Sequence, residues 1–281
     1  MLVAVGSGTI HDIARFASHK TGIPFVSIPT APSVDGYASV GAPLTIRGMK
    51  QTFPAIQPIA IFADLRLLTK APQAMIAAGF GDMIGKFTSL FDWKFSHLTA
   101  DEPYDEQVAQ ITASSLRACA ENAIGIGSRS EEGIKILTNA LIESGIAMML
   151  FGKSHPASAA EHHLSHYWEM EYLSTGKRAL LHGAKVGVAC AEISRIYHDA
   201  VDQGIYPGKK PWQLDKYKTQ IEAWMEEVPT EAEIRELLKQ VGGQTHYTEL
   251  GITEELYERS THEAHHIRDR HTLLRALNEA K

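Results

Sequence analysis

The sequence predicts an α/β portion followed by an all-helical portion, and two observations carry this prediction. The first 65 or so residues alternate short apolar runs with turn-forming residues, in the order strand, helix, strand that is typical of a parallel α/β unit. After about Ala71, long apolar patterns with helical spacing dominate. We therefore expect a first domain over residues 1–70 and a second, helical domain over residues 71–281.

The α/β portion opens with the apolar run Leu2–Val5, which predicts a buried strand that ends at Gly6-Ser7-Gly8. Apolar residues then recur with helical spacing from Thr9 to about Lys20. Residues 24–28 and 59–63 predict two further strands, the first stopped by Pro29. A nucleotide-binding sheet normally has about six strands. Because the first strand has nothing to flank it, either the N-terminus is truncated, which we expect, or other elements replace the missing strands.

The helical portion contains four long periodic segments and a break. The pattern predicts helices over residues 102–123, 131–150, 158–172 and 178–198. A segment with glycine and prolines interrupts the pattern between Gln203 and Trp212, and helices rich in Glu and Lys resume from about Leu214. No internal repeat is visible.

Composition excludes several classes of function. The 281 residues are 44% hydrophobic and 21% charged with a net charge of -6, as in a globular protein without a concentrated basic face. No apolar run approaches the roughly 20 residues that span a bilayer. Cys119 and Cys190 stand far apart, which argues against a disulfide framework and a thiolate metal site. We expect a cytoplasmic protein without nucleic-acid or membrane partners, and leave a homo-oligomer open.

Two loops follow the first two predicted strands. Gly6–Asp12 lies between a strand and a helix, where glycines let the backbone approach a ligand and the helix N-terminus favours a pyrophosphate. It lacks the full GxGxxG spacing, so an ordinary βα turn is an equal alternative. Ser27–Ser39 is rich in hydroxyls and prolines, and the alternative here is a surface loop. Ligands of open α/β sheets bind at such strand ends.

A metal constellation is predicted in the helical portion. Asp82 and Lys86 are four residues apart in apolar surroundings, where a buried carboxylate needs a partner. His162 and His166 share one face of a predicted helix, and His182 begins another, beside Gly183 and Gly187, which allow close helix packing. One histidine alone is more often structural than a ligand. One carboxylate with two imidazoles, however, suits zinc or another late divalent ion and leaves coordination positions open.

Five motifs in this order resemble a known family. The segments GSGTIHD, SIPTAPSVDGYAS, GFGDMIGK, EHHLSH and LLHGAKVG are similar to those of the dehydroquinate synthase-like superfamily, which includes the iron-type alcohol dehydrogenases. Within it, the sequence most resembles the glycerol-1-phosphate dehydrogenases, in particular the bacterial form associated with arabinose-utilisation operons. The resemblance runs through essentially the whole chain. It implies part of a Rossmann-type dinucleotide-binding domain over residues 1–70 and a metal- and substrate-binding helical domain over residues 71–281.

The resemblance also implies an activity and a set of site residues. Family members interconvert dihydroxyacetone phosphate and sn-glycerol 1-phosphate with NAD(H) or NADP(H) and use one zinc or nickel ion. Asp82, His162 and His182 would hold the metal, while Asp35, Asp82 and His166 would contact substrate, with Asp82 and His166 catalytic. The cofactor would lie against the glycine turn and the hydroxyl-rich loop, through Gly8, Thr9, Ile10, His11, Asp12, Thr30, Ala31, Pro32, Ser33 and Ser39.

Three alternatives stay open at this point. A glycerol or other polyol dehydrogenase would share the metal site without a phosphate pocket, for which Lys86 and Lys185 are candidate cations. A cyclase of the dehydroquinate synthase type is disfavoured, because Asp82 stands where those enzymes are expected to have Glu. The non-enzymatic alternative is a truncated, inactive remnant that retains metal binding.

Overall fold

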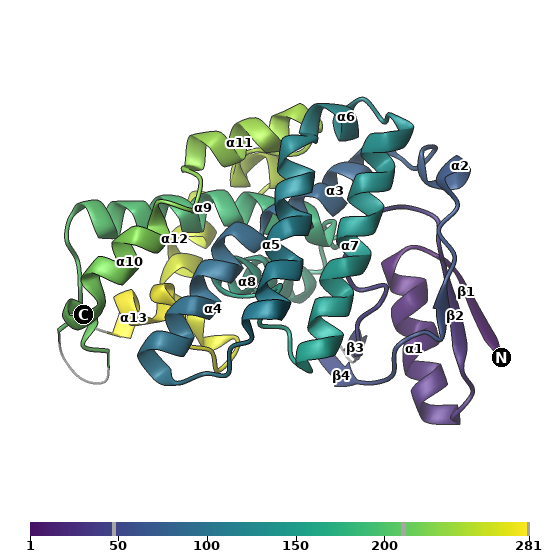
Figure 1. Ribbon diagram of the computed structural model, residues 1–281, viewed down its shortest axis with the longest axis horizontal. Helices are drawn as coiled ribbons and strands as arrows, with labels where there is room; N and C mark the ends of the chain where they lie inside the picture. Colours follow the sequence, from purple (N-terminus) through teal and green to yellow (C-terminus); the bar gives the residue numbers. More distant parts are fainter. Residues whose placement is uncertain (47–48, 209–211, 280–281) are drawn as a thin grey trace.

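The computed structural model describes residues 1–46, 49–208 and 212–279. Its α/β portion holds a small parallel sheet with the strand order β1-β2-β5, formed by Leu2–Gly6, Phe25–Pro29 and Ala60–Ile61. Helix α1 (Gly8–Thr21) connects the first two strands, and the short α2 (Leu65–Leu68) follows the third. The sheet and α1 stand at one end of the molecule, beside the helical mass (Figure 1). The predicted strand–helix–strand order is confirmed, although the third strand is shorter than expected.

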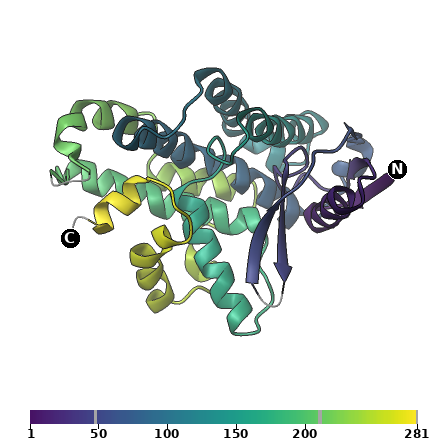
Figure 2. The same cartoon turned by 90° about the horizontal axis from the view of Figure 1, so that it is seen from below.

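An antiparallel hairpin, which the sequence analysis did not predict, follows β2. Strand β3 (Gly41–Ile46) pairs with β4 (Met49–Pro54), from Gly41 opposite Pro54 to Ile46 opposite Met49. Phe53 packs edge-on against Phe16 of α1, with ring centroids 5.4 Å apart. Figure 2 shows the hairpin as two long arrows that project from the sheet end of the molecule.

The helical portion begins at α3 and runs to the end of the described chain. Its α-helices are α3 (Gln73–Ile84), α4 (Lys86–Ala100), α5 (Glu106–Glu121), α6 (Ala123–Gly127), α7 (Glu131–Phe151), α8 (Ala160–Ser174), α9 (His182–Asp202), α10 (Lys218–Met225), α11 (Glu231–Gln240), α12 (Glu254–Glu263) and α13 (Leu273–Glu279). Single 3-10 turns occur at η1 (Leu214–Tyr217), η2 (Tyr247–Leu250) and η3 (Ala264–His266). The predicted α/β-then-helical fold class is confirmed.

Capping residues explain where two predicted helices begin. The Asp105 side chain accepts a hydrogen bond from the Val108 amide, so α5 starts at Glu106 instead of residue 102. The Ser130 side chain caps α7 in the same way through the Gly133 amide. Helix α9 starts at His182, four residues later than expected. Within the predicted break at 203–212, residues 209–211 lie outside the described chain.

Helices α3 and α9 cross at glycines. A Cβ atom added at Gly183 would lie 1.7 Å from the Ala78 carbonyl oxygen, and one at Gly81 would lie 2.3 Å from the Gly183 carbonyl oxygen. Gly187 meets the same turn, with 2.9 Å to the Gly81 Cα atom. The predicted close packing at Gly183 and Gly187 is confirmed. Because the backbones touch, the first residue of α9 is fixed beside the last turn of α3.

Helix α7 is long and apolar enough, by length and composition alone, to cross a membrane. In its most apolar window, 44% of the residues are buried inside the protein, where Leu137 and Leu141 join a core cluster with Phe80 of α3. A core helix of a globular protein passes the same test, so this finding is weak evidence for a span.

Candidate metal centre

Three helices bring together one carboxylate and two imidazoles. Asp82 lies in the last turn of α3, His162 in the first turn of α8, and His182 is the first residue of α9. One ligand atom from each of these residues lies within 4.8 Å of the other two. Asp82 is fully buried, and His162 is 6% exposed. Residues separated by 80 and 20 positions in the chain thus present their donor atoms to one point.

The spacing of the donor atoms fits a shared cation. The Nε2 atoms of His162 and His182 lie 3.7 Å and 3.9 Å from Asp82 Oδ1, beyond hydrogen-bonding distance. An ion with about 2.0–2.2 Å to each nitrogen or oxygen ligand separates those ligands by about 3–4 Å. The residues present therefore fit a divalent metal in number, type and spacing.

A buried lysine and a backbone amide hold the Asp82 carboxylate in place. Lys86 Nζ lies 3.2 Å from Asp82 Oδ1 and 2.8 Å from Asp35 Oδ2, and the Asp35 amide donates to Asp82 Oδ2 at 2.9 Å. Burial lowers the pKa of Lys86, but the two carboxylates outweigh it and raise that pKa above its ordinary value. Lys86 is therefore a fixed positive charge that orients two carboxylates.

Glu161, which the sequence analysis missed, determines the tautomer of His162. Its carboxylate is fully buried and lies 2.7 Å from His162 Nδ1, while Thr88 Oγ1 and the Ala159 amide also donate to it. Burial raises the pKa of Glu161, but hydrogen bonds, led by that with His162, bring it below the ordinary value. An ionised carboxylate only accepts, so Nδ1 carries the proton and Nε2 presents a lone pair towards Asp82.

His166 lies beside the three donors without being one of them. Its ring centroid is 6.2 Å from that of His162 and 5.8 Å from that of His182. It is partly exposed, one turn further along α8 than His162. The predicted shared face of His162 and His166 is present in the structure.

The glycine turn and the hydroxyl-rich loop meet at one edge of the sheet. Gly6 is in register with Pro29 in the parallel β1–β2 pair, and the Thr30 amide donates to the Gly6 carbonyl oxygen at 2.8 Å. Thr9 and Ile10 are exposed in the first turn of α1, where Gly8 packs on Val34. Asp12, which follows this turn, is half-buried. The His11 ring is buried edge-on against Tyr37. Its side chain thus faces the protein interior.

Arg15 ties the glycine turn to the hydroxyl-rich loop. Its buried guanidinium donates to Asp12 Oδ1 at 2.8 Å, to the Tyr37 and Gly41 carbonyl oxygens at 3.2 Å each, and to the Gly36 carbonyl oxygen. In the same loop Ala31, Pro32 and Ser33 are buried, and Ser39 Oγ accepts from the Gly41 amide. This arginine was also missed, since sequence alone did not indicate that a helical Arg would be buried.

Asp35 extends this loop to the metal centre. Besides the Lys86 contact, its Oδ2 atom accepts from Ser144 Oγ of α7 at 2.9 Å. Gly79 of α3 packs directly on the Pro32 carbonyl oxygen. The hydroxyl-rich loop and the predicted metal ligands therefore lie side by side. The Asp35 amide bonds to Asp82, and Lys86 pairs with the carboxylates of both residues.

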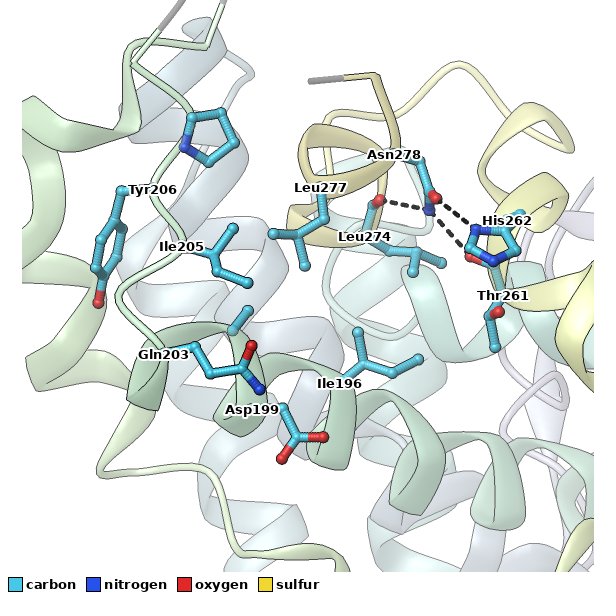
Figure 3. Close-up of a pocket in the computed structure, with 12 residues that line it drawn as sticks. Ile196, Asp199, Gln203, Ile205, Tyr206, Thr261, His262, Leu274, Leu277 and Asn278 are labelled. Atoms are coloured by element: carbon cyan, nitrogen blue, oxygen red, sulfur yellow. Dashed lines mark hydrogen bonds between the residues drawn. The ribbon is translucent and has the colours of Figure 1, made fainter. Parts of the chain in front are cut away.

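A cavity lies away from these residues. A cavity of about 470 Å³ opens between the C-terminal half of α9, the segment after it and helices α12 and α13 (Figure 3). Its wall is largely apolar, with Ile196, Ile205 and Leu277, and His262 contacts Asn278 Oδ1 there at 3.1 Å. Ile196 is 14 residues from His182, about 20 Å along a helix. The cavity is therefore separate from the metal centre.

Comparison with known proteins places this chain in a family. A sequence profile described as "Iron-containing alcohol dehydrogenase" matches residues 1–72. The glycerol-1-phosphate dehydrogenase (NAD(P)+) of Geobacillus thermodenitrificans (strain NG80-2) is 50% identical over 287 residues, covering 99% of this chain and 71% of the relative. The chain belongs to the glycerol-1-phosphate dehydrogenase family. The family predicted from the five motifs is thereby confirmed, and with it the prediction of an oxidoreductase.

The glycerol-1-phosphate dehydrogenase family extends to archaea. The protein of that name from Thermococcus kodakarensis (strain ATCC BAA-918 / JCM 12380 / KOD1) is 35% identical, covering 97% of this chain and 68% of the relative. Among solved structures, the iron-containing alcohol dehydrogenase from Corynebacterium glutamicum ATCC 13032 superposes with a TM-score of 0.69 at 17% identity, over 99% of this chain and 72% of that one. At that identity the superposition establishes the fold alone.

Proposed function

We propose that this chain catalyses the NAD(P)H-linked interconversion of dihydroxyacetone phosphate and sn-glycerol 1-phosphate. The observation that carries the proposal is the convergence of Asp82, His162 and His182 beside the loop that holds Asp35, in a chain 50% identical to an enzyme of that name. The other features of the site support the same reaction.

The proposal assigns the metal to the three converging residues. Two neutral imidazoles and one carboxylate suit zinc or nickel. When bound there, the ion supplies a positive charge that polarises the carbonyl oxygen of the ketone. Asp82 holds its position through Lys86 and the Asp35 amide, and Glu161 keeps the lone pair of His162 Nε2 available. Burial of Asp82 keeps water away from its carboxylate.

The proposal assigns the dinucleotide to the carboxyl edge of the parallel sheet. Gly8–His11 form the first turn of α1, whose N-terminus favours phosphate, and this turn contains no acidic residue. Asp12 follows the turn, with its carboxylate held by Arg15. Backbone amides of the turn suit this contact better than the buried His11 ring. Thr30–Ser33 and Ser39 lie on the neighbouring loop, between this turn and Asp82. The proposed domain division follows from these assignments: residues 1–70 would bind the dinucleotide, and residues 71–281 would bind the metal and substrate.

The remaining roles fall to side chains beside the metal ligands. In the reductive direction, hydride adds to the carbonyl carbon while the oxygen takes up a proton. His166 is a titratable side chain beside His162 and His182 that is not one of the three converging donors, and we assign it to substrate binding and proton handling. Asp35 orients Asp82 and lies close enough to line the substrate site. A small molecule turned over in the cytoplasm requires no nucleic-acid or membrane partner.

Replacing His166 separates its proposed role from metal binding. For His166→Ala we expect metal content unchanged and kcat/KM lowered by about 10²–10⁴-fold, the usual contribution of a positioned acid or base. Metal analysis after dialysis and steady-state kinetics measure the two quantities on one sample. Loss of the metal from this variant would show that His166 is a ligand and that the assignment is wrong.

Replacing Glu161 tests the tautomer argument. For Glu161→Gln we expect metal affinity to fall by about 10-fold or more, because partners of this kind contribute 10–100-fold. Titration of the metal-free chain with Zn²⁺ measures the change. Glu143→Gln is the matched control, since that exposed glutamate accepts from Ser115 away from the centre. Equal affinities for the two variants would exclude a role of Glu161 in orienting His162.

The reaction itself is tested by NADH oxidation with dihydroxyacetone phosphate, after supplementing the purified chain with Ni²⁺ or Zn²⁺. Unphosphorylated dihydroxyacetone is the control substrate. Metal-dependent turnover of the phosphate ester alone is the expected result. Equal turnover of both compounds would identify a general polyol dehydrogenase, and turnover of neither compound would contradict the proposal for this chain.

A further inference from the structure

A substrate with a phosphate group needs a cation, and the two lysines suggested by the sequence are already engaged. Lys86 is fully buried between Asp35 and Asp82. Lys185 is also fully buried, with Nζ 2.7 Å from Glu169 Oε2. A lysine whose charge is held by buried carboxylates cannot turn towards a phosphate without leaving those carboxylates uncompensated. The phosphate must therefore find its positive charge elsewhere.

Arg268 supplies a positive charge beside the loop that leads into α8. Its Nη1 atom donates to Ser158 Oγ at 3.2 Å and to Ser154 Oγ at 3.4 Å. Within the described ranges 1–46, 49–208 and 212–279, no carboxylate oxygen lies within 4 Å of its guanidinium. Each serine hydroxyl that accepts from the arginine still has a proton to donate. A guanidinium flanked by two hydroxyls is a suitable receptor for phosphate oxygens.

Two neighbouring side chains have buried polar atoms without a protein partner. His163 is 1% exposed, and neither of its ring nitrogens has a hydrogen-bond partner among the residues that the structure describes. Arg270 is 5% exposed, and its Nη2 atom also has no hydrogen-bond partner among the described residues. Its Nε atom lies 3.5 Å from Glu102 Oε2. Buried polar groups of this kind require a partner, such as a bound anion or ordered water.

Two backbone amides at the start of α8 already have carboxylate acceptors. The Ala159 amide donates to Glu161 Oε1 at 2.8 Å, and the Ala160 amide donates to Asp92 Oδ2 at 3.2 Å. The amides of Ala159 and Ala160 are therefore occupied by carboxylates, and the side chains of Arg268, Ser154 and Ser158 are the donors that we consider for an anion. The turn η3, which lies just before Arg268 in the chain, packs against α8, the helix that presents His162 and His166 to the metal centre.

We propose that Arg268, together with the hydroxyls of Ser154 and Ser158, binds the phosphate group of the substrate. This assignment rests on the proposed function and makes Arg268 its specificity-determining residue. Its charge distinguishes the phosphate ester from the unphosphorylated polyol, because only the ester carries an anion to compensate the guanidinium.

The test measures ligand binding as well as turnover. Calorimetric titration of the metal-loaded chain with sn-glycerol 1-phosphate and with glycerol compares the two ligands in Arg268→Met, Arg268→Lys and the unsubstituted chain. We expect Arg268→Met to weaken binding of the phosphate ester about 10–100-fold, the usual effect of losing hydrogen bonds to a charged group. Arg268→Lys restores part of the loss, since it returns the charge without the fork of donors. Arg259→Met is the control, because Arg259 is a half-exposed arginine that pairs with Glu171.

The outcomes separate this proposal from the proposed reaction. Weaker binding of the phosphate ester in Arg268→Met, with a much smaller change for glycerol, supports the assignment even where turnover is absent. Equal losses for both ligands would show a purely structural role and overturn it. Unchanged binding in Arg268→Met, with turnover of dihydroxyacetone phosphate intact, would overturn the assignment and leave the reaction standing. No binding of the phosphate ester by the unsubstituted chain would overturn both.

Discussion

Asp82→Asn is expected to bind Zn²⁺ or Ni²⁺ at least about 100-fold more weakly and to retain less than about 1% of the turnover. The substitution keeps the shape of the side chain and its contact with the Asp35 amide, but removes the negative charge that compensates both the metal and Lys86. Replacing a residue that only hydrogen-bonds to a metal ligand already weakens metal binding 10–100-fold. Replacing a charged ligand itself is therefore expected to weaken metal binding by at least the upper end of that range. Metal analysis after dialysis and NADH oxidation measure the two effects.

The control for this variant is Asp269→Asn, because Asp269 is a highly exposed carboxylate paired with Arg275. His182→Ala should reproduce the loss of metal, since it removes one of the three converging donor atoms. Full metal content together with full activity in Asp82→Asn would show that the three converging residues are not the functional metal site.

Gly183→Ala is expected to lower both the free energy of unfolding and the metal affinity. The added Cβ atom would lie 1.7 Å from the Ala78 carbonyl oxygen, so helices α3 and α9 must move apart. Overpacking typically costs about 1–3 kcal/mol, and a clash with rigid backbone belongs at the upper end of that range. His182 is the residue next to Gly183, so the same displacement moves a ligand away from Asp82. Denaturant unfolding and Zn²⁺ titration measure the two consequences.

Gly208→Ala is the matched control. It also replaces a glycine by alanine and so restricts the backbone, but it introduces no clash. A Cβ atom there would lie 3.5 Å from the Asp215 carboxyl carbon, which is ordinary contact distance. An unfolding free energy of Gly183→Ala equal to that of the parent chain would mean that the two helices do not approach as closely as the structure indicates.

The convergence of Asp82, His162 and His182 was within reach of the sequence, for local physical reasons. Helical periodicity put His162 at the start of one helix, and small residues beside His182 indicated a close helix crossing. Which carboxylate joins them depends on long-range packing, and there the resemblance to a family supplied the answer. The β3–β4 hairpin was missed because Pro43 and Pro54 interrupt the alternating pattern by which strands are recognised.

Partners of buried charges were the least predictable part of the site. Lys86 and Lys185 were candidate phosphate-binding cations in the sequence, yet both are enclosed with carboxylates from other segments of the chain. Likewise Glu161 precedes a candidate ligand by one residue, but its orientation towards His162 follows from Thr88 and the Ala159 amide. Such pairings arise only when segments far apart in the chain are placed together, so no local pattern encodes them.

The hydrogen bond between the Asp35 amide and Asp82 Oδ2 joins the proposed metal site to the loop proposed to bind the dinucleotide. A displacement of the loop that carries Asp35 changes the basicity and position of a metal ligand, and occupation of the metal site in turn favours the loop position in which that bond is made. Thermodynamic linkage requires this coupling to be reciprocal: whatever factor the dinucleotide contributes to metal affinity, the metal contributes to dinucleotide affinity. One backbone amide thus gives the two cofactors a route to cooperative assembly.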